Sequence, residues 1–316
     1  MSDWLRQVLI AAALAGAALA TAPWVLGEFE VSLALTILMY VGLAVSWALF
    51  CGPTLYLSLA TSAFFGIGAY VTAWGLGTLP YAVVVPLGGL AAAAFAALVG
   101  AAVLHLRGAY FAVITFGLGE LVRHAIAYFE KSYFMTVGRV LTDTPEKTTV
   151  YLTVLAIALA AVIAYALVRE SRFGLALGGI GADEQRAQTL GVNTRAVKVA
   201  GFTLSALFAG MLGAAIAVRW IYLDPPTVFN PFIGFQTVLI AMLGGAHTLL
   251  GPIVSAVVFS LFTEFLRLRF PYAYLLVLGT LLIIVVLYLP RGFAQLWEGW
   301  RARRDRPARA AESPRA

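Results

Sequence analysis

The stretch SRFGLALGGIGADEQRAQTLGVNTRAVKVAG, residues 171–201, is polar and rich in glycine, whereas the chain around it is strongly apolar. Of the 316 residues, 62% are hydrophobic and 11% are charged, and the mean hydropathy is +0.92. A soluble domain must cover itself with polar surface, so this composition excludes that class. We therefore interpret 171–201 as a loop at a membrane surface between two membrane-spanning segments.

Ten apolar runs are close to the length that a helix needs to cross a hydrocarbon core of ~30 Å, which is about 20 residues. The predicted fold is an all-α polytopic membrane protein, with a transmembrane domain over 1–290 and a basic, disordered cytoplasmic tail over 291–316 that lies near anionic lipid. The runs lie at 8–26, 31–50, 54–74, 80–104, 109–129, 150–168, 198–218, 232–250, 251–268 and 271–289.

The lysines and arginines predict the orientation, because cytoplasmic loops carry an excess of them. With the amino terminus inside, fourteen of the 21 cationic residues face the cytoplasm. Four of them lie in the loop 169–197, and Lys198 follows directly after it. Both termini are then cytoplasmic in a multi-pass plasma-membrane protein. The first run is also compatible with a cleaved signal peptide that ends at Ala18-Leu19-Ala20, and cleavage leaves the other nine spans oriented as before.

Two of the predicted spans look interrupted. A Gly-Pro pair precedes a helix rich in small residues at Gly52-Pro53 and again at Gly251-Pro252, once in each half of the chain. Broken helices in matching positions are typical of inverted repeats around a transport pathway. A chance repetition of Gly-Pro explains the pattern nearly as well, so the duplication remains a hypothesis.

Three ionisable residues stand within one predicted span. Glu120, Arg123 and His124 lie at i, i+3 and i+4, where the Glu and the Arg can pair on one helix face. Such an intramembrane ion pair lines a translocation path or gate, or else fixes the packing of the helix. A proton relay needs further acids within spans, and Glu264 and Asp224 fall near or beyond span ends, which argues against a proton pump.

No enzymatic motif is present in the sequence. The chain has no Gly-Lys pair, so it has no phosphate-binding loop of the Gly-x-x-x-x-Gly-Lys-Ser/Thr kind, and it has no nucleophile elbow or zinc-protease motif. The three scattered histidines and the single Cys51 predict no metal site and no internal disulfide. The net charge of +6 follows from the membrane topology and requires no nucleic-acid partner.

The polar loop contains a candidate short helix, ADEQRAQTL. Asp183 and Glu184 stand in its first turn, where acids complement the helix dipole, and Gly191 is suited to a left-handed cap at its end. Asp183 and Arg186 are spaced to form an ion pair. A nine-residue helix is too short to be stable alone, and this one lacks the apolar face of an interfacial helix, so we expect it to dock on another protein.

Taken together, four stretches resemble the permease family of bacterial ABC importers for branched-chain amino acids, and most closely its M-type subunit. The likeness covers about residues 30 to 290 and implies a fold like that of type II importer permeases. The stretches are LSLATSAFFGIGAY (57–70), LRGAYFAVITFGLGELVR (106–123), the loop with the span after it (171–215) and MLGGAHTLLGP (242–252).

The resemblance implies partners and a mechanism. It implies a homologous permease subunit, two cytoplasmic ATPase subunits that bind ATP-Mg, and a periplasmic or lipid-anchored substrate-binding protein at the bacterial inner membrane. The chain itself then needs no cofactor. The short helix is the coupling element that inserts into the ATPase, and its expected coupling residues are Gly181, Asp183, Glu184, Arg186 and Gly191.

The pathway and the solute are less closely defined. Ser58, Thr61 and Phe64 follow the first helix break and are expected to face the pathway, with Thr115 and Glu120 opposite. Gln236, a lone amide within a span, either forms an interhelical hydrogen bond or contacts the solute.

The chain departs from the family pattern at Leu55-Tyr56, Ala60 and Thr61, and it lacks two loop cations at 174–181. The resemblance implies that the solute is a branched-chain or hydrophobic amino acid, or a related small solute such as urea, a short amide or an aromatic acid.

Two other classes were weighed against the importer permease. A self-sufficient secondary transporter needs ligands for a coupling ion within its spans, and these are sparse. An intramembrane enzyme needs a catalytic constellation, which the sequence does not contain.

Overall fold

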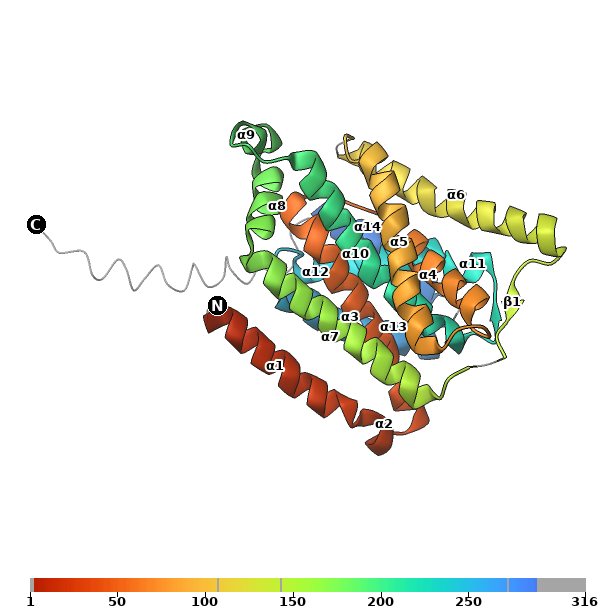
Figure 1. The fold of residues 1–316 in the computed structure, drawn as a ribbon. Coiled ribbons are helices and arrows are strands. Elements are labelled where there is room, and N and C mark those ends of the chain that lie inside the picture. Colours follow the sequence, from red (N-terminus) through yellow and green to blue (C-terminus); the bar gives the residue numbers. More distant parts are fainter. Residues whose placement is uncertain (1–2, 107, 143, 272, 289–316) are drawn as a thin grey trace, which may run out of the picture.

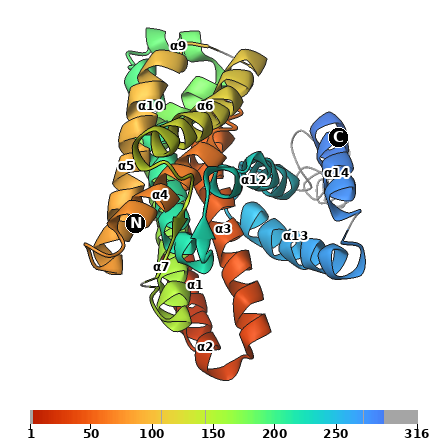
Figure 2. The same ribbon diagram turned by 90° about the vertical axis from the view of Figure 1, so that its right-hand side faces the viewer.

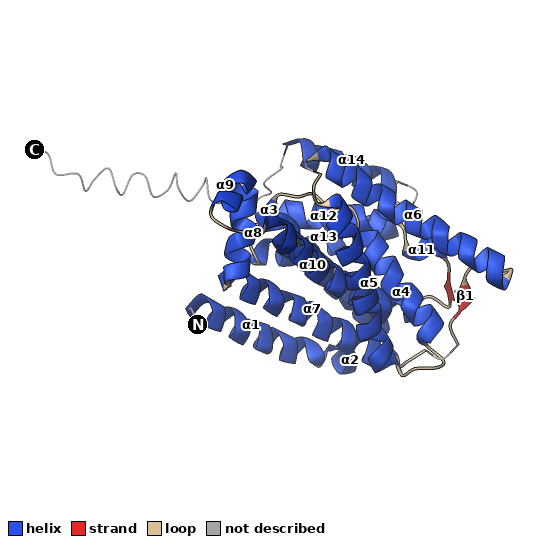
Figure 3. Ribbon diagram, turned by 45° about the horizontal axis from the view of Figure 1, so that its top comes forward, coloured by secondary structure: helices blue, strands red, loops and turns tan. Residues whose placement is uncertain are grey.

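The structure, a computed structural model, describes residues 3–106, 108–142, 144–271 and 273–288. These residues are helical almost throughout, with one small antiparallel sheet of two strands (Figure 3). The elements in chain order are α1 (Asp3–Ala20), α2 (Ala22–Val25), α3 (Glu28–Thr54), α4 (Thr61–Gly75), α5 (Tyr81–Val103), α6 (Ala109–Phe134), β1 (Arg139–Val140), α7 (Lys147–Glu170), α8 (Arg172–Ala182), α9 (Glu184–Thr189), α10 (Thr194–Ile216), the 3-10 turn η1 (Ala217–Arg219), β2 (Tyr222–Leu223), α11 (Pro225–Val228), α12 (Pro231–Gly244), α13 (Leu250–Arg269) and α14 (Tyr274–Tyr288).

The all-α polytopic fold is confirmed. Within the described residues, eight helical segments are long and apolar enough to cross a membrane, and they match eight of the ten predicted runs. The other two runs correspond to α4 and α14, which have 15 residues each. The predicted tail 291–316 lies outside the described residues.

Helix α10 is the centre of the bundle. It packs against α5, α4, α3 and α7, and Figure 1 shows it running between α3 and α5. Glycine permits the closest approaches, because a Cβ at Gly213 would lie 1.9 Å from the Phe65 carbonyl oxygen, and one at Gly68 would lie equally close to the Gly210 carbonyl oxygen. In a membrane the hydrophobic effect does not drive helices together, and small residues instead allow the close van der Waals packing that does.

The remaining helices surround this core. α1 packs along α7 at the periphery. α13 and α14 lie beyond α3 and α12, on the side away from α5 (Figure 2). α6 diverges from the bundle and meets α4 and α11 through one face.

The chain is interrupted at both predicted breaks, and the two breaks touch each other. Pro53 lies in the last turn of α3, Leu55 is left-handed with φ of 61°, and α4 begins only at Thr61. The Gly-Pro pair at 52–53 therefore ends the first helix, whereas the sequence had predicted a new span from residue 54, at this pair. The second break separates α12 from α13, and a Cβ at Gly52 would lie 2.2 Å from the Ala246 carbonyl oxygen.

The two ends of the bundle carry different structures. α8 and α9 lie at one end, which we call the α9 end, and β1 and β2 lie at the other, which we call the sheet end (Figure 1). In the sheet, Arg139 pairs with Leu223 and Val140 with Tyr222. α6 reaches Phe134 at the sheet end, so residues 130–134 belong to a helix where the sequence had predicted a loop.

Candidate functional site

The predicted coupling loop folds into two helices. The sequence predicted one short helix, and the structure adds α8 before it. Ser171 caps α8 by accepting a hydrogen bond from the Gly174 amide at 3.1 Å. Leu177 and Ile180, one turn apart, are buried, and α8 packs against α3, α7 and α10. Packing of these two side chains outweighs the low helix propensity of the four glycines in α8.

The second helix, α9, has six residues and not the predicted nine, because it begins at Glu184 and Asp183 precedes it as the cap. The predicted left-handed glycine at its end is confirmed. Asp183 caps α9, because its Oδ1 accepts hydrogen bonds from the amides of Gln185 at 3.0 Å and Arg186 at 3.1 Å. Its Oδ2 also pairs with the Arg186 Nε at 3.0 Å, as the i, i+3 spacing predicted. Gly191 follows α9 with φ of 85°, a left-handed conformation in which glycine avoids the strain of a side chain.

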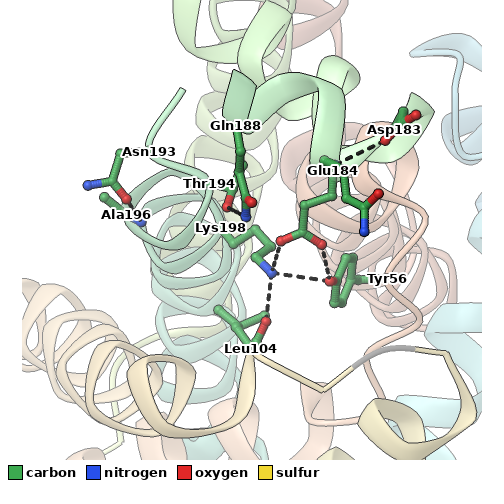
Figure 4. A network of polar contacts seen from close by, with 10 residues as sticks. Tyr56, Leu104, Asp183, Glu184, Gln188, Asn193, Thr194, Ala196 and Lys198 are labelled. Atoms are coloured by element: carbon green, nitrogen blue, oxygen red, sulfur yellow. Dashed lines mark hydrogen bonds and ion pairs between the residues drawn. The ribbon is translucent and has the colours of Figure 1, made fainter. Parts of the chain in front are cut away.

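Glu184 points toward the bundle, although it is next to Asp183, whose side chain is 40% exposed (Figure 4). Its Oε1 lies 2.7 Å from the Lys198 Nζ, and only 9% of its side chain and 5% of that of Lys198 are exposed. Its Oε2 accepts a hydrogen bond from the Tyr56 hydroxyl at 3.0 Å. α9 is therefore tied to the membrane helices through a buried carboxylate.

The ammonium of Lys198 has three partners. It donates to Glu184 at 2.7 Å, to the Leu104 carbonyl at 2.7 Å and to the Tyr56 hydroxyl at 3.1 Å. Three is the number of donors that an ammonium has, so its hydrogen-bonding capacity is filled. We call Tyr56, Leu104, Glu184 and Lys198 the ammonium cluster.

Each member of the ammonium cluster comes from a different element. Lys198 lies in the first turns of α10, Leu104 caps the end of α5, and Tyr56 lies in the break between α3 and α4. The Leu104 carbonyl is one of the orphan acceptors at a helix end, which explains why a cation is favourable there. The cluster thus connects α9 with α5, α10 and the break between α3 and α4.

A second contact holds the loop in place. A Cβ at Gly181 would lie 2.0 Å from the Pro53 carbonyl oxygen. The end of α8 is therefore seated directly on the last turn of α3, beside the first helix break. Only glycine permits this approach without displacing the backbone of one helix.

The outer face of α9 is open to solvent. Leu190 is 84% exposed and the Arg186 side chain 85% exposed. Two open pockets, of about 450 and 540 Å³, lie on either side of Glu184. The first is bordered by Leu55 and Gln185, and the second by His105.

Most of the predicted pathway residues are buried within the chain. Ser58, Thr61, Phe64, Thr115 and Gln236 are each at most 5% exposed. The Thr115 hydroxyl accepts a hydrogen bond from the Leu59 amide at 3.0 Å, which satisfies one of the donors that the helix break leaves free. Phe64 packs edge-on against Phe202, with ring centres 5.2 Å apart.

Gln236 and Glu120 have definite partners. The Tyr40 hydroxyl donates to the Gln236 Oε1 at 2.7 Å, which is the interhelical hydrogen bond that was the first of its two predicted roles. Glu120 and Arg123 form the predicted ion pair at 2.5 Å, and each side chain remains about one quarter exposed. Their role in a pathway stays a prediction.

Sequence reasoning missed Lys198, Tyr56 and Glu130. Lys198 was counted only as a loop cation, and Tyr56 only as a departure from a family pattern. Glu130 is 1% exposed near the end of α6, where the sequence predicted a loop. The i+4 spacing of Val122, Ile126 and Glu130 along one face was the available signal for this burial.

The chain is similar to known transport permeases over most of its length. A model of the family described as "Branched-chain amino acid transport system / permease component" matches residues 29–286. The high-affinity branched-chain amino acid transport system permease protein LivM of Escherichia coli (strain K12) is 28% identical over 324 residues, which cover 91% of this chain and 75% of that protein. LivM of Salmonella typhimurium is 27% identical over 307 residues, covering 85% and 71%.

A shorter match involves a different transporter. The nucleoside ABC transporter permease protein NupC of Lactococcus lactis subsp. cremoris is 34% identical over 106 residues, 33% of this chain and 32% of that protein. No solved structure matches the chain. The family model spans most of the chain, from the first turn of α3 through α13, and includes the predicted coupling loop. The chain therefore belongs to the family of branched-chain amino acid transport system permease components.

Proposed function

We propose that the chain is one of two permease subunits in an ATP-driven importer of branched-chain or other hydrophobic amino acids, and that α9 is its contact with an ATPase subunit. Membership of the permease family supports the transporter class. The two LivM relatives, which are named for branched-chain amino acids, match most of the chain. The chain has no phosphate-binding loop, so ATP-Mg binds to two separate ATPase subunits.

The observation that carries the coupling role is the Glu184–Lys198 pair. α9 presents Arg186 and Leu190 outward for a partner, while Glu184 and Gly181 attach it to the bundle. A force on the outer face of α9 is therefore transmitted to α5, to α10 and to the end of α3 at the first break. Closure of the ATPase pair then shifts the equilibrium between two discrete arrangements of these helices.

The orientation follows from the positive-inside rule. The α9 end carries Arg169, Arg172, Arg186, Arg195 and Lys198 and faces the cytoplasm, so both termini are cytoplasmic in a bacterial inner membrane. The sheet end then faces the compartment from which a periplasmic or lipid-anchored binding protein delivers the solute. A homologous permease subunit completes the membrane domain.

The pathway is assigned to the region around the first helix break. Glu120 and Arg123 on α6 remain partly exposed at the middle of a predicted span, and charged groups at that depth line water-filled cavities or subunit contacts. Ser58, Thr61, Phe64, Thr115 and Gln236 become pathway residues only if movement of α4 exposes them. A largely apolar pathway suits an amino acid with an apolar side chain.

Cross-linking tests the contact that we propose. Leu190→Cys in a Cys51→Ser background places one thiol on the outer face of α9. With the ATPase subunits in membranes, we expect it to cross-link to an ATPase subunit, and we expect Leu175→Cys on α8 to cross-link far less. Absence of a cross-link at 190 in a complex that transports leucine would contradict the role of α9.

Transport by the reconstituted complex tests the function as a whole. In proteoliposomes with the partner permease, the ATPase subunits and the binding protein, uptake of radiolabelled leucine should require ATP. Uptake that is driven instead by an ion gradient, with no ATP, would identify a secondary transporter.

A further inference from the structure

A pocket of about 400 Å³ opens at the sheet end, far from the coupling loop. Ala73 of α4 and Glu130 and Phe134 of α6 form one part of it. The segment that leads into β1 forms the rest, with Thr136, Gly138, Arg139 and Val140. A buried acid and a partly exposed base thus meet in one open pocket, whose lining also includes the apolar residues Ala73, Phe134 and Val140.

Glu130 is incompletely satisfied. Its Oε2 accepts hydrogen bonds from the Gly138 amide at 2.7 Å and from the Tyr70 hydroxyl at 3.2 Å. Its Oε1 is buried and has no hydrogen-bond partner among the described residues. Buried carboxylate oxygens are nearly always hydrogen-bonded, so the pocket lacks a donor at this position.

Arg139 is the nearest cation, but it does not close the pair. Its Nε lies 3.6 Å from the Glu130 Oε1, whereas a charge-assisted hydrogen bond of this kind is about 2.7 to 2.9 Å long. The guanidinium lies over the Phe134 ring, 4.6 Å from its centre, and its side chain is 32% exposed. Its two terminal nitrogens carry four N–H groups that the contact with Glu130 does not use.

We propose that this pocket binds the zwitterionic head group of an amino acid, as an outer site that receives the cargo before translocation. Arg139 moves away from Glu130 on binding, so that the α-ammonium takes the place of its Nε and donates to the Glu130 Oε1. The α-carboxylate binds the fork of Arg139, which matches a carboxylate in two-point geometry. Ala73, Phe134 and Val140 provide an apolar wall for the side chain. This assignment rests on the proposed function and narrows its substrate class.

Charge balance selects a zwitterion over other small solutes. An ammonium and a carboxylate on one carbon convert the single loose Glu130–Arg139 pair into two close ion pairs. A simple amine would face the guanidinium, and a simple acid would face the buried carboxylate, so each would bring like charges together. Urea and short amides carry no charge and would leave the Glu130–Arg139 pair as it is.

Binding to the complex without the binding protein is the direct test. The permease pair with its ATPase subunits, in nanodiscs, is titrated with radiolabelled leucine. We expect saturable binding that Glu130→Gln and Arg139→Lys each weaken at least tenfold. Glu28→Gln and Lys147→Met are matched controls, because they remove an exposed ion pair at the same end (3.1 Å), and they should leave binding unchanged.

Competition on the unaltered complex decides the chemistry even if a variant fails to fold. Unlabelled leucine should compete, whereas leucinol, which lacks the carboxylate, and 4-methylpentanoate, which lacks the ammonium, should each compete at least tenfold more weakly. Equal competition by either analogue overturns the proposal. So does wild-type affinity in folded Glu130→Gln, or the absence of leucine binding to a complex that transports leucine.

The same assays separate this site from the proposed function. Loss of ATP-driven uptake by the unaltered complex contradicts the importer itself, whatever the pocket binds. ATP-driven leucine uptake with an unchanged KM in both Glu130→Gln and Arg139→Lys leaves the importer standing and removes the outer site.

Discussion

The Lys198 ammonium and the Glu184 carboxylate meet at 2.7 Å, with at most 9% of either side chain exposed. One belongs to a membrane-spanning helix and the other to a six-residue helix at the membrane surface. The isolated six-residue helix is too short to be stable in water. This buried pair therefore defines where α9 sits and what moves with it.

Replacing Lys198 by Met should destabilise the protein by about 3 to 5 kcal/mol, because it removes the cation from a buried carboxylate. The double variant Lys198→Met/Glu184→Gln removes both charges and should recover most of that loss. Thermal unfolding in detergent measures both effects. In the folded double variant, the amount of solute taken up per ATP hydrolysed should be lower than in the wild type. A wild-type ratio in that variant would show that the Glu184–Lys198 pair contributes to stability alone.

A methyl group at position 181 should separate α8 from α3. The Cβ of Gly181→Ala would lie 2.0 Å from the Pro53 carbonyl oxygen, so one of the two backbones must shift. We expect a loss of ATP-driven uptake of at least tenfold with ATP hydrolysis retained. Gly178→Ala in the same helix is the control, because no atom lies within 4 Å of a Cβ there, and it should transport normally.

The cap of α9 should be measurable by itself. Asp183→Ala removes the acceptor for the amides of Gln185 and Arg186, and loss of such a cap costs about 1 kcal/mol. Hydrogen exchange of residues 184–189 should then be roughly fivefold faster. Asp183→Asn keeps a side-chain oxygen and should exchange nearly as slowly as the wild type. Equal exchange rates in the wild type and both variants would mean that the cap does not stabilise α9 and that packing alone holds it.

The hydrogen bond between Tyr40 and Gln236 should contribute modestly to stability. Tyr40→Phe removes the donor, and interhelical hydrogen bonds of this kind in membranes contribute about 0.6 to 1.7 kcal/mol. Ser46→Ala is a matched control on α3, because among the described residues the Ser46 hydroxyl bonds only to the Leu43 carbonyl of the same helix. A loss from Ser46→Ala as large as that from Tyr40→Phe would refute an interhelical role. Chemical unfolding in mixed micelles provides the comparison.

The sequence predicted those parts of the site that depend only on neighbouring residues. Asp183 and Gly191 delimit α9 because a cap and a left-handed glycine act within a few residues of themselves. Apolar runs predicted the spans for the same reason. The exact position of the first break was not predictable, because Pro53 is accommodated in the last turn of α3.

The tertiary contacts of the site were not predictable from one sequence. Nothing near Lys198 indicates that its partners are Tyr56 and Leu104, which lie 142 and 94 residues away. The burial of Glu130 likewise depends on Tyr70, 60 residues earlier, and on a turn that follows it. Pairings of this range are set by how the helices pack, and no local pattern encodes them.

The spacing of the ammonium cluster along the chain has a consequence for biogenesis. Tyr56 and Leu104 are synthesised long before Glu184 and Lys198. The hydroxyl in the first break therefore has no cluster partner until α9 is made, and the carbonyl at the end of α5 has none until α10 begins. The cluster closes only when the start of α10 reaches the membrane. Nascent chains that stop before residue 198 should therefore expose these groups to membrane quality-control proteases, and completion of α10 should end that exposure.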